Sequence, residues 1–296
     1  MSHRLQVGVA AVAALAFAGG AFYWLHEPTE RSQSALASAP EAAPTEKRAG
    51  EKSPAAKSSE ISSSRGAKKA APDADPGIPL RTGEILEFTA DVGKVSSVAN
   101  LRLQVAEQRN FLGKNAWHLQ AFAHTENPLR MVFELDDQFD SYSDAGTLSS
   151  LQYEMHLSER GQRVDSVQRM TTTGKEPAPA NVTEARVLPG TRDPLGMMQY
   201  LRSVDWSKTH EVRGPVYDGH KLYEVRAGLA AASESVTVPA GHYEAAKIEI
   251  RVFNGGAEMK DAHFFLYLAH DDTHTPVLLE AVLPFATARV ALKSSK

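Results

Sequence analysis

The sequence predicts an all-β protein: an antiparallel curved sheet or half-open barrel with one short helix, preceded by an N-terminal transmembrane helix and a disordered linker. Three observations support this prediction. Beyond residue 80, apolar residues alternate with polar ones over most of the chain, which is typical of half-buried strands. Turn dipeptides such as Asp218-Gly219 separate these runs. One segment, residues 195–204, has helical spacing instead.

The alternating runs are the predicted strands. They cover residues 86–92, 99–105, 151–157, 164–170, 212–217, 221–227, 236–250, 262–268, 277–283 and 287–292. Pro239-Ala240-Gly241 interrupts the longest run, and Asn254-Gly255-Gly256 predicts a further turn. So many antiparallel strands fit one long sheet that is nearly closed into a barrel.

The helical segment has a clear start signal. Asp193 suits the N-cap position and Pro194 the first helical position. Leu195, Met198 and Leu201 then fall on one helix face. We expect a short helix that lies across an opening of the sheet.

The N-terminus predicts a membrane anchor within residues 1–25. Residues 5–25 form a nearly unbroken apolar run that ends in Tyr23 and Trp24, and about 20 such residues span a bilayer core. Arg4 precedes the run, so the positive-inside rule predicts a single-pass protein of the bacterial inner membrane with its C-terminal domain in the periplasm. The alternatives are a signal that is cleaved near Ala18–Ala21, leaving a soluble periplasmic protein, and a buried helix of the head.

Residues 26–80 are predicted to be a disordered linker, and residues 81–296 a periplasmic β-rich domain. The linker is rich in Ala, Ser and Pro, and its acidic and basic residues balance. Such a segment has too few large apolar side chains to offset the entropy of ordering. Residues 65–69 have a second interpretation as a small basic docking site.

Composition excludes several classes of function. The formal net charge of −4 is not that of a nucleic-acid-binding protein. The absence of cysteine excludes disulfides, thiolate metal sites and a cysteine nucleophile. No serine lies in a Gly-x-Ser-x-Gly motif. We therefore expect a protein that is not an enzyme and that needs no cofactor.

Several segments together resemble a known family. They are Gly83–Phe88, Asp137–Tyr142, Asp193–Arg202, Val236–Ile248 and Asp271–Val277. In this order they are similar to domain-of-unknown-function family 3108, a group of bacterial envelope proteins, over about residues 81–290. The resemblance implies a β-rich periplasmic domain with no established activity and hence no catalytic residues. A wider likeness to half-open barrels that carry lipids or lipoproteins is an analogy of fold only.

Two clusters of polar residues invite a chemical interpretation. His270 and His274 lie beside two aspartates and are weak candidates for metal ligands. A polar hairpin loop is the favoured interpretation, and we predict no metal site. Asp136, Asp137 and Asp140 are either paired acid–base carboxylates or solvated carboxylates of a turn, and we favour the turn.

Four residues are candidates for ligand binding. Arg202 on the helix is placed to hold an anionic head group inside the sheet, with Met198 beside it. Phe265 and Tyr267 are candidates to line an apolar pocket. The alternatives are an outward or structurally ion-paired arginine and aromatic residues that belong to the core.

These observations give three functional hypotheses. The first is a non-enzymatic module, tethered to the inner membrane through residues 5–25, that acts as a binding or scaffold component of a bacterial envelope complex, with envelope proteins as partners. The second is a carrier that binds a lipid or a lipoprotein acyl chain in the half-open barrel. The third is a metal-dependent hydrolase centred on His270 and His274.

Overall fold

The computed structural model describes residues 77–172, 179–282 and 286–296. The predicted anchor at residues 1–25 and most of the predicted linker lie outside the described residues, so both stay predictions. None of the helices in the described ranges has the length and apolar composition that crossing a bilayer requires.

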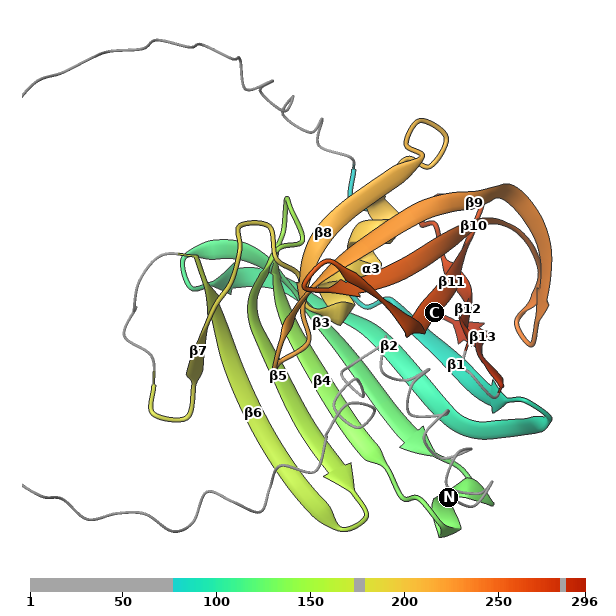
Figure 1. Cartoon of the computed structure of the whole chain (residues 1–296), viewed down its shortest axis with the longest axis horizontal. Coiled ribbons are helices and arrows are strands. Elements are labelled where there is room, and N and C mark those ends of the chain that lie inside the picture. Colours follow the sequence, from blue (N-terminus) through green and yellow to red (C-terminus); the bar gives the residue numbers. More distant parts are fainter. Residues whose placement is uncertain (1–76, 173–178, 283–285) are drawn as a thin grey trace, which may run out of the picture. The chain divides into compact units, whose positions relative to one another are not determined.

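The described residues form one sheet of thirteen strands with a single α-helix, which confirms the all-β prediction (Figure 1). The strands are β1 (Ile85–Val92), β2 (Val95–Phe111), β3 (Lys114–Thr125), β4 (Asp136–Asp144), β5 (Ser150–Glu159), β6 (Gln162–Thr171), β7 (Thr183–Arg186), β8 (Glu211–Tyr217), β9 (Leu222–Val238), β10 (Gly241–Asn254), β11 (Ala257–Ala269), β12 (Pro276–Val282) and β13 (Thr287–Ser295). The helix is α3 (Pro194–Ser203), and η1 (Leu129–Met131) is one 3-10 turn.

The strand order is β7-β6-β5-β4-β3-β2-β1-β13-β12-β11-β10-β9-β8. Consecutive strands therefore pair with each other except β7 and β8, and the β1–β13 pair joins the two halves of the chain. All pairs are antiparallel except β6–β7. β7 and β8 are the two ends of the sheet, so the sheet is curved and open (Figure 1).

Three strands were not predicted: β3, β4 and β7. β4 has the sequence Asp-Asp-Gln-Phe-Asp-Ser-Tyr-Ser-Asp, in which only two residues are apolar. It forms a strand because β3 and β5 pair with it on both sides. β7 is only four residues long and pairs in parallel with β6, so no local pattern distinguishes it.

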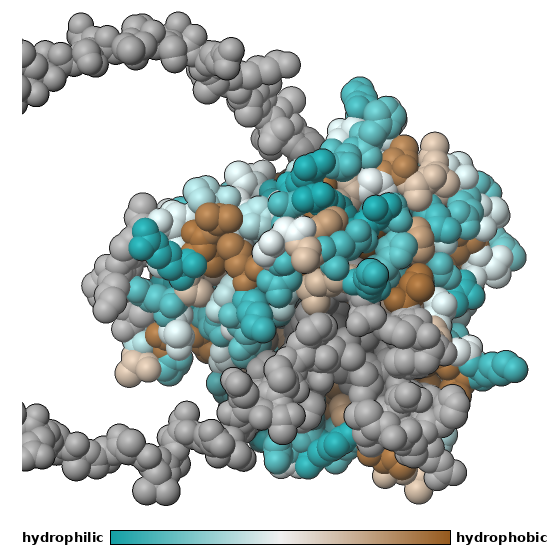
Figure 2. Space-filling view, in the orientation of Figure 1, coloured by the Kyte–Doolittle hydropathy of each residue, from teal (hydrophilic) through white to brown (hydrophobic). Residues whose placement is uncertain are grey.

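The two faces of the sheet differ in character. The register places Leu86 beside Leu103, and the same row continues through Ala121, Phe139 and Met155. All five are buried in the core, and we call this the inner face. The opposite, outer face is largely polar, and Figure 2 shows hydrophilic side chains predominating over β8 and β9 with apolar ones between them.

The helix α3 lies within the curve of the sheet (Figure 1) and contacts β3, β4 and β8. Its start is as predicted: Asp193 is the N-cap, and its carboxylate accepts a hydrogen bond from the Gly196 amide at 2.8 Å. The same carboxylate accepts the hydroxyls of Ser141 on β4 and Ser150 on β5, each at 2.5 Å. The cap therefore also fastens the helix to the sheet.

The turn between β8 and β9 docks on the inner face of the other half of the sheet. The side-chain amide of Gln168 on β6 donates to the Gly219 carbonyl. Gly219 has a φ of +99°, and an added Cβ would lie 2.4 Å from the Met155 side chain. The positive φ favours glycine here, and a larger residue would also displace the end of the Met155 side chain. The hydrogen bond from Gln168 joins the two halves across the curve.

Gly196 generates a test of the helix attachment. A Cβ at this position would lie 3.0 Å from Ser143 Oγ and 3.1 Å from the Leu148 carbonyl oxygen. Gly196→Ala should lower the free energy of unfolding by about 1–3 kcal/mol through overpacking. Urea denaturation measures the change. Gly146→Ala is the control, because its Cβ would have 3.7 Å to the nearest atom; equal losses in both variants would contradict the packing argument.

Candidate functional site

The inside of the curve is occupied by α3. Leu195, Met197, Met198 and Leu201 are each at most 4% exposed and belong to the core cluster. Met198 therefore packs against the sheet, and its proposed contact with a ligand stays a prediction.

Arg202 is fully buried and bound on every side by protein groups. Its guanidinium makes a bidentate pair with Glu84, at 2.9 Å for both N–O distances. It also donates to the Thr273 carbonyl and to the side-chain oxygen of Gln199 at 2.8 Å. These five hydrogen bonds occupy all the donors of a guanidinium. The geometry is that of a structural ion pair, one of the two alternatives for this residue, and it leaves no donor for an anionic head group.

Phe265 and Tyr267 lie on the outer face, not around an apolar pocket. Lys247 contacts both rings, at 4.8 and 5.1 Å from their centroids. The Tyr267 hydroxyl donates to Glu280 at 3.1 Å, and burial raises the pKa of this tyrosine. Their ligand role stays a prediction. Tyr267 is 3% exposed and belongs to the core cluster, and Phe265 packs against that cluster, as the alternative interpretation expects.

The candidate metal ligands are held by separate backbone carbonyls. His270 Nε2 lies 3.0 Å from the Ala232 oxygen, and His274 Nδ1 lies 2.7 Å from the Arg202 oxygen. In the part of the chain that the structure describes, no three His, Asp or Glu side chains gather as metal ligands would.

The interpretation of Asp136, Asp137 and Asp140 as solvated turn carboxylates is wrong for two of the three. All three lie on β4, and Asp137 and Asp140 are 6% and 4% exposed. Strand alternation sends these two to opposite faces, so they are not a catalytic pair. The error arose because β4 is too polar to be recognised as a strand.

Asp140 is the centre of a polar network on the outer face. Burial opposes its ionisation, but hydrogen bonds outweigh burial and hold the pKa of Asp140 below its usual range. The donors are His118 at 2.7 Å, Gln120 at 2.8 Å and Gln138 at 2.7 Å. With its oxygens occupied in this way, Asp140 links β3 to β4 and is not free to accept a substrate proton.

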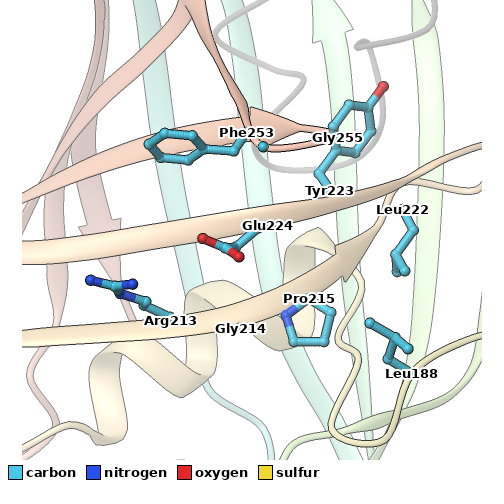
Figure 3. A pocket seen from close by; sticks show the side chains of 10 residues that line it. Leu188, Arg213, Gly214, Pro215, Leu222, Tyr223, Glu224, Phe253 and Gly255 are labelled. Atoms are coloured by element: carbon cyan, nitrogen blue, oxygen red, sulfur yellow. The ribbon is translucent and has the colours of Figure 1, made fainter.

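An apolar hollow lies at the edge of the sheet formed by β8 (Figure 3). It is a hollow of about 410 Å³ on the outer side of β8, β9 and the β10–β11 turn. Its lining includes Leu188, Arg213, Pro215, Leu222, Glu224 and Phe253. Leu188 and Leu222 are 55% and 37% exposed, so both present apolar surface to solvent beside the hollow.

The β8 strand next to this hollow has a partly vacant edge. The Arg192 amide donates to the Pro215 carbonyl at 3.1 Å, and the Tyr217 amide donates to the Arg192 carbonyl at 2.9 Å. The odd-numbered residues of β8 therefore point their backbone groups away from β9. Glu211 and Arg213 do the same, and their outward groups have no backbone partner within the described ranges.

Comparison with protein families gives one match. The family model described as "Protein of unknown function (DUF3108)" matches residues 87–293. This chain belongs to the DUF3108 family. The match confirms the resemblance predicted from the motif order, and it assigns no activity to the chain.

Solved structures show a limited similarity to this DUF3108 protein. A β-barrel-like protein with domain of unknown function DUF1849 from Brucella abortus has 10% identity and a TM-score of 0.47, over 73% of this chain and 97% of that chain. A protein provisionally named as a lipoprotein from Parabacteroides distasonis has 14% identity and a TM-score of 0.35, over 74% and 97%. A Bacteroides fragilis protein with a YmcC-like fold has 11% identity and a TM-score of 0.29, over 74% and 98%. These scores carry no argument about function.

The curated proteins give no match to this chain. The function of the DUF3108 chain must therefore be inferred from its own geometry. The sequence did contain one signal for the β8 edge, since proline within a strand pattern is typical of an edge strand. Pro215 is such a residue, but the hollow beside it depends on residues from three separate segments.

The buried pair of Arg202 and Glu84 yields a stability prediction. Arg202→Met leaves Glu84 without its charged partner and should cost about 3–5 kcal/mol in the free energy of unfolding. The double variant with Glu84→Gln should recover part of this loss. Arg289→Met, which removes the exposed pair with Glu280, is the control and should cost less than about 1 kcal/mol. A similar small cost for Arg202→Met would contradict the structural role.

Asp137 yields a prediction about pH. Burial raises the pKa of Asp137 to about 6, while the Ser158 amide that donates to it at 2.9 Å opposes the rise. The folded state therefore holds the proton more tightly than the unfolded state, whose pKa is about 4. The protonated carboxyl of Asp137 therefore adds to the free energy of unfolding. This contribution is fully present below pH 4 and is lost as the pH rises through 6.

The measurement compares wild type with Asp137→Asn. The unfolding free energy of wild type should fall relative to the variant by up to about 3 kcal/mol between pH 4 and pH 7. Asp136→Asn is the control, because Arg130 lowers the pKa of Asp136 and the slope should have the opposite sign. If the unfolding free energies of wild type and Asp137→Asn change in parallel with pH, the raised pKa of Asp137 is refuted.

Proposed function

We propose that this chain is a non-enzymatic binding module of a bacterial envelope complex, which binds a partner protein at the β8 edge. In this proposal residues 5–25 anchor the chain in the inner membrane, residues 26–80 form the linker, and the head works in the periplasm. The envelope setting is supported by the N-terminal apolar run and by its charge distribution.

The partly vacant edge of β8 carries the proposal. A strand edge with outward backbone groups pairs with an extended segment of another chain, and side-chain pockets beside the edge supply specificity. Here Arg213 offers the backbone groups and lines the hollow itself. Leu188 and Leu222 offer exposed apolar surface at the same place. Backbone pairing and apolar anchoring thus lie within one site.

The carrier hypothesis has less support from the contacts. The hollow beside β8 and a second hollow over β1, β2, β3 and β13 are both lined mainly by outer-face side chains. The two ligand candidates on α3 are not available to a ligand in this way: Met198 is packed in the core, and Arg202 is bonded to Glu84. A site for a protein partner on the outside fits these contacts better than an acyl chain within the curve.

The experiment is site-specific photo-crosslinking of the full chain in living cells. A photoreactive residue at Leu222 should give a discrete adduct with one envelope protein. The matched control is Val282, which is 40% exposed against 37% for Leu222 and lies on β12, away from the hollow. Equal adduct patterns at both positions would refute the proposal.

A second pair of variants tests whether the strand edge itself takes part. Arg213→Pro removes an outward N–H and leaves the bonds to β9 in place, whereas Arg213→Ala removes only the side chain. The Leu222 adduct should be lost in Arg213→Pro and kept in Arg213→Ala. Retention in both variants would show that backbone pairing is not used.

A further inference from the structure

The second hollow lies on the outer face over β1, β2, β3 and β13, away from the β8 edge. Its volume is about 440 Å³. Six outer-face residues line it: Glu87, Asn100, Arg102, Phe122, His124 and Lys293. The register explains the grouping, since Glu87, Arg102 and Phe122 are cross-strand neighbours in one row.

The two cations of this hollow differ from the arginines of β8 to β13. On β8 to β13 each arginine has a carboxylate partner; the pairs are Arg213–Glu211, Arg226–Glu224, Arg251–Glu249 and Arg289–Glu280. Within the described ranges, Arg102 bonds only to the neutral side chain of Gln104, and Lys293 has no ion pair. Both cations are therefore available to an external anion.

A β-bulge takes Lys293 out of register with the nearby carboxylate of Glu87. Glu87 pairs with Ser294 and Phe88 with Leu292, so Lys293 is the extra residue of the bulge. The bulge places Ser294 opposite Glu87, and the Ser294 hydroxyl donates to the Glu87 carboxylate at 2.9 Å. The Glu87 carboxylate keeps its negative charge, but its hydrogen bond is to Ser294, and it forms no ion pair with Lys293 or Arg102 within the described residues.

Of the remaining lining residues, Phe122 is apolar, and Asn100 and His124 bond to an acidic residue beside the hollow. The Arg102 guanidinium lies 5.8 Å from the centroid of Phe122, whose ring forms a side of the hollow. Asn100 and His124 both bond to Glu126, at 2.7 and 3.1 Å. The acidic group on this side is therefore also held by protein partners.

We infer that this hollow binds a phosphate ester whose phosphate lies between Arg102 and Lys293 and whose organic part covers Phe122. A phosphate has enough charge and acceptor oxygens to engage a guanidinium and an ammonium together. The Phe122 ring gives an organic group attached to the phosphate a surface to pack against. A soluble phosphate ester and a phospholipid head group share this chemistry. The site is separate from the β8 edge, so this inference does not depend on the proposed function.

The test is isothermal titration calorimetry on the full chain in phosphatidylcholine nanodiscs, with glycerol 3-phosphate and inorganic phosphate as probes. Glycerol 3-phosphate should bind more tightly than inorganic phosphate. Arg102→Gln and Lys293→Gln should each weaken its binding about tenfold. Arg289→Gln, on the same strand as Lys293 but paired with Glu280, should leave binding unchanged.

Two further arms define the ligand. Phe122→Ala should weaken glycerol 3-phosphate and leave inorganic phosphate unaffected. In nanodiscs that contain phosphatidylglycerol, loss of the glycerol 3-phosphate signal shows that the lipid competes and assigns the site to a lipid head group. An unchanged signal assigns the site to a soluble ester. Either result supports the inference. No binding to wild type, or equal binding to wild type and to both Arg102→Gln and Lys293→Gln, overturns it.

Discussion

The attachment of α3 at both its ends is the constraint on which the rest of this structure depends. Asp193 is fully buried at the start of the helix, where burial raises its pKa and the hydrogen bonds from Ser141 and Ser150 oppose that rise. Arg202 near the end binds Glu84 and the β11–β12 loop. Because the first group holds β4 and β5 and the second holds Glu84, which directly precedes β1, a single short helix connects distant strands of an open sheet. A buried charge left without its partner is costly, so these contacts specify one curvature.

This arrangement decides where binding takes place. The apolar face of the helix fills the curve, so the residues that resemble a ligand site in the sequence become parts of the core or of its ion pairs. The outer face keeps the accessible features: the β8 edge with its hollow, and the unpaired cations Arg102 and Lys293. Neither feature is a catalytic constellation. Both are surfaces suited to recognition, one of an extended polypeptide and the other of an anion.

The strands that could be predicted are those whose burial produces a regular alternation. β1 buries every second residue, as does the part of β10 from Ala246 to Val252, and their sequences show it. β4 does not, because Asp137 and Asp140 are buried through hydrogen bonds and not through apolar contact. The site residues could not be predicted for a related reason. Arg202 has the same helical position whether it binds a ligand or Glu84, and the 118 residues that separate it from Glu84 carry no signal of the contact.

The sequence by itself determined the local features: the period of two that defines the strands, the Asp193-Pro194 start of the helix and the glycine turns. Motif order also sufficed to identify the family. Only the tertiary structure decided which face is filled, which strands become edges and which charges lack partners. The physical reason is the separation along the chain over which each interaction acts. Alternation and capping act within a few residues, whereas the pairing of β1 with β13 and the ion pair of Arg202 join residues that are distant in the chain.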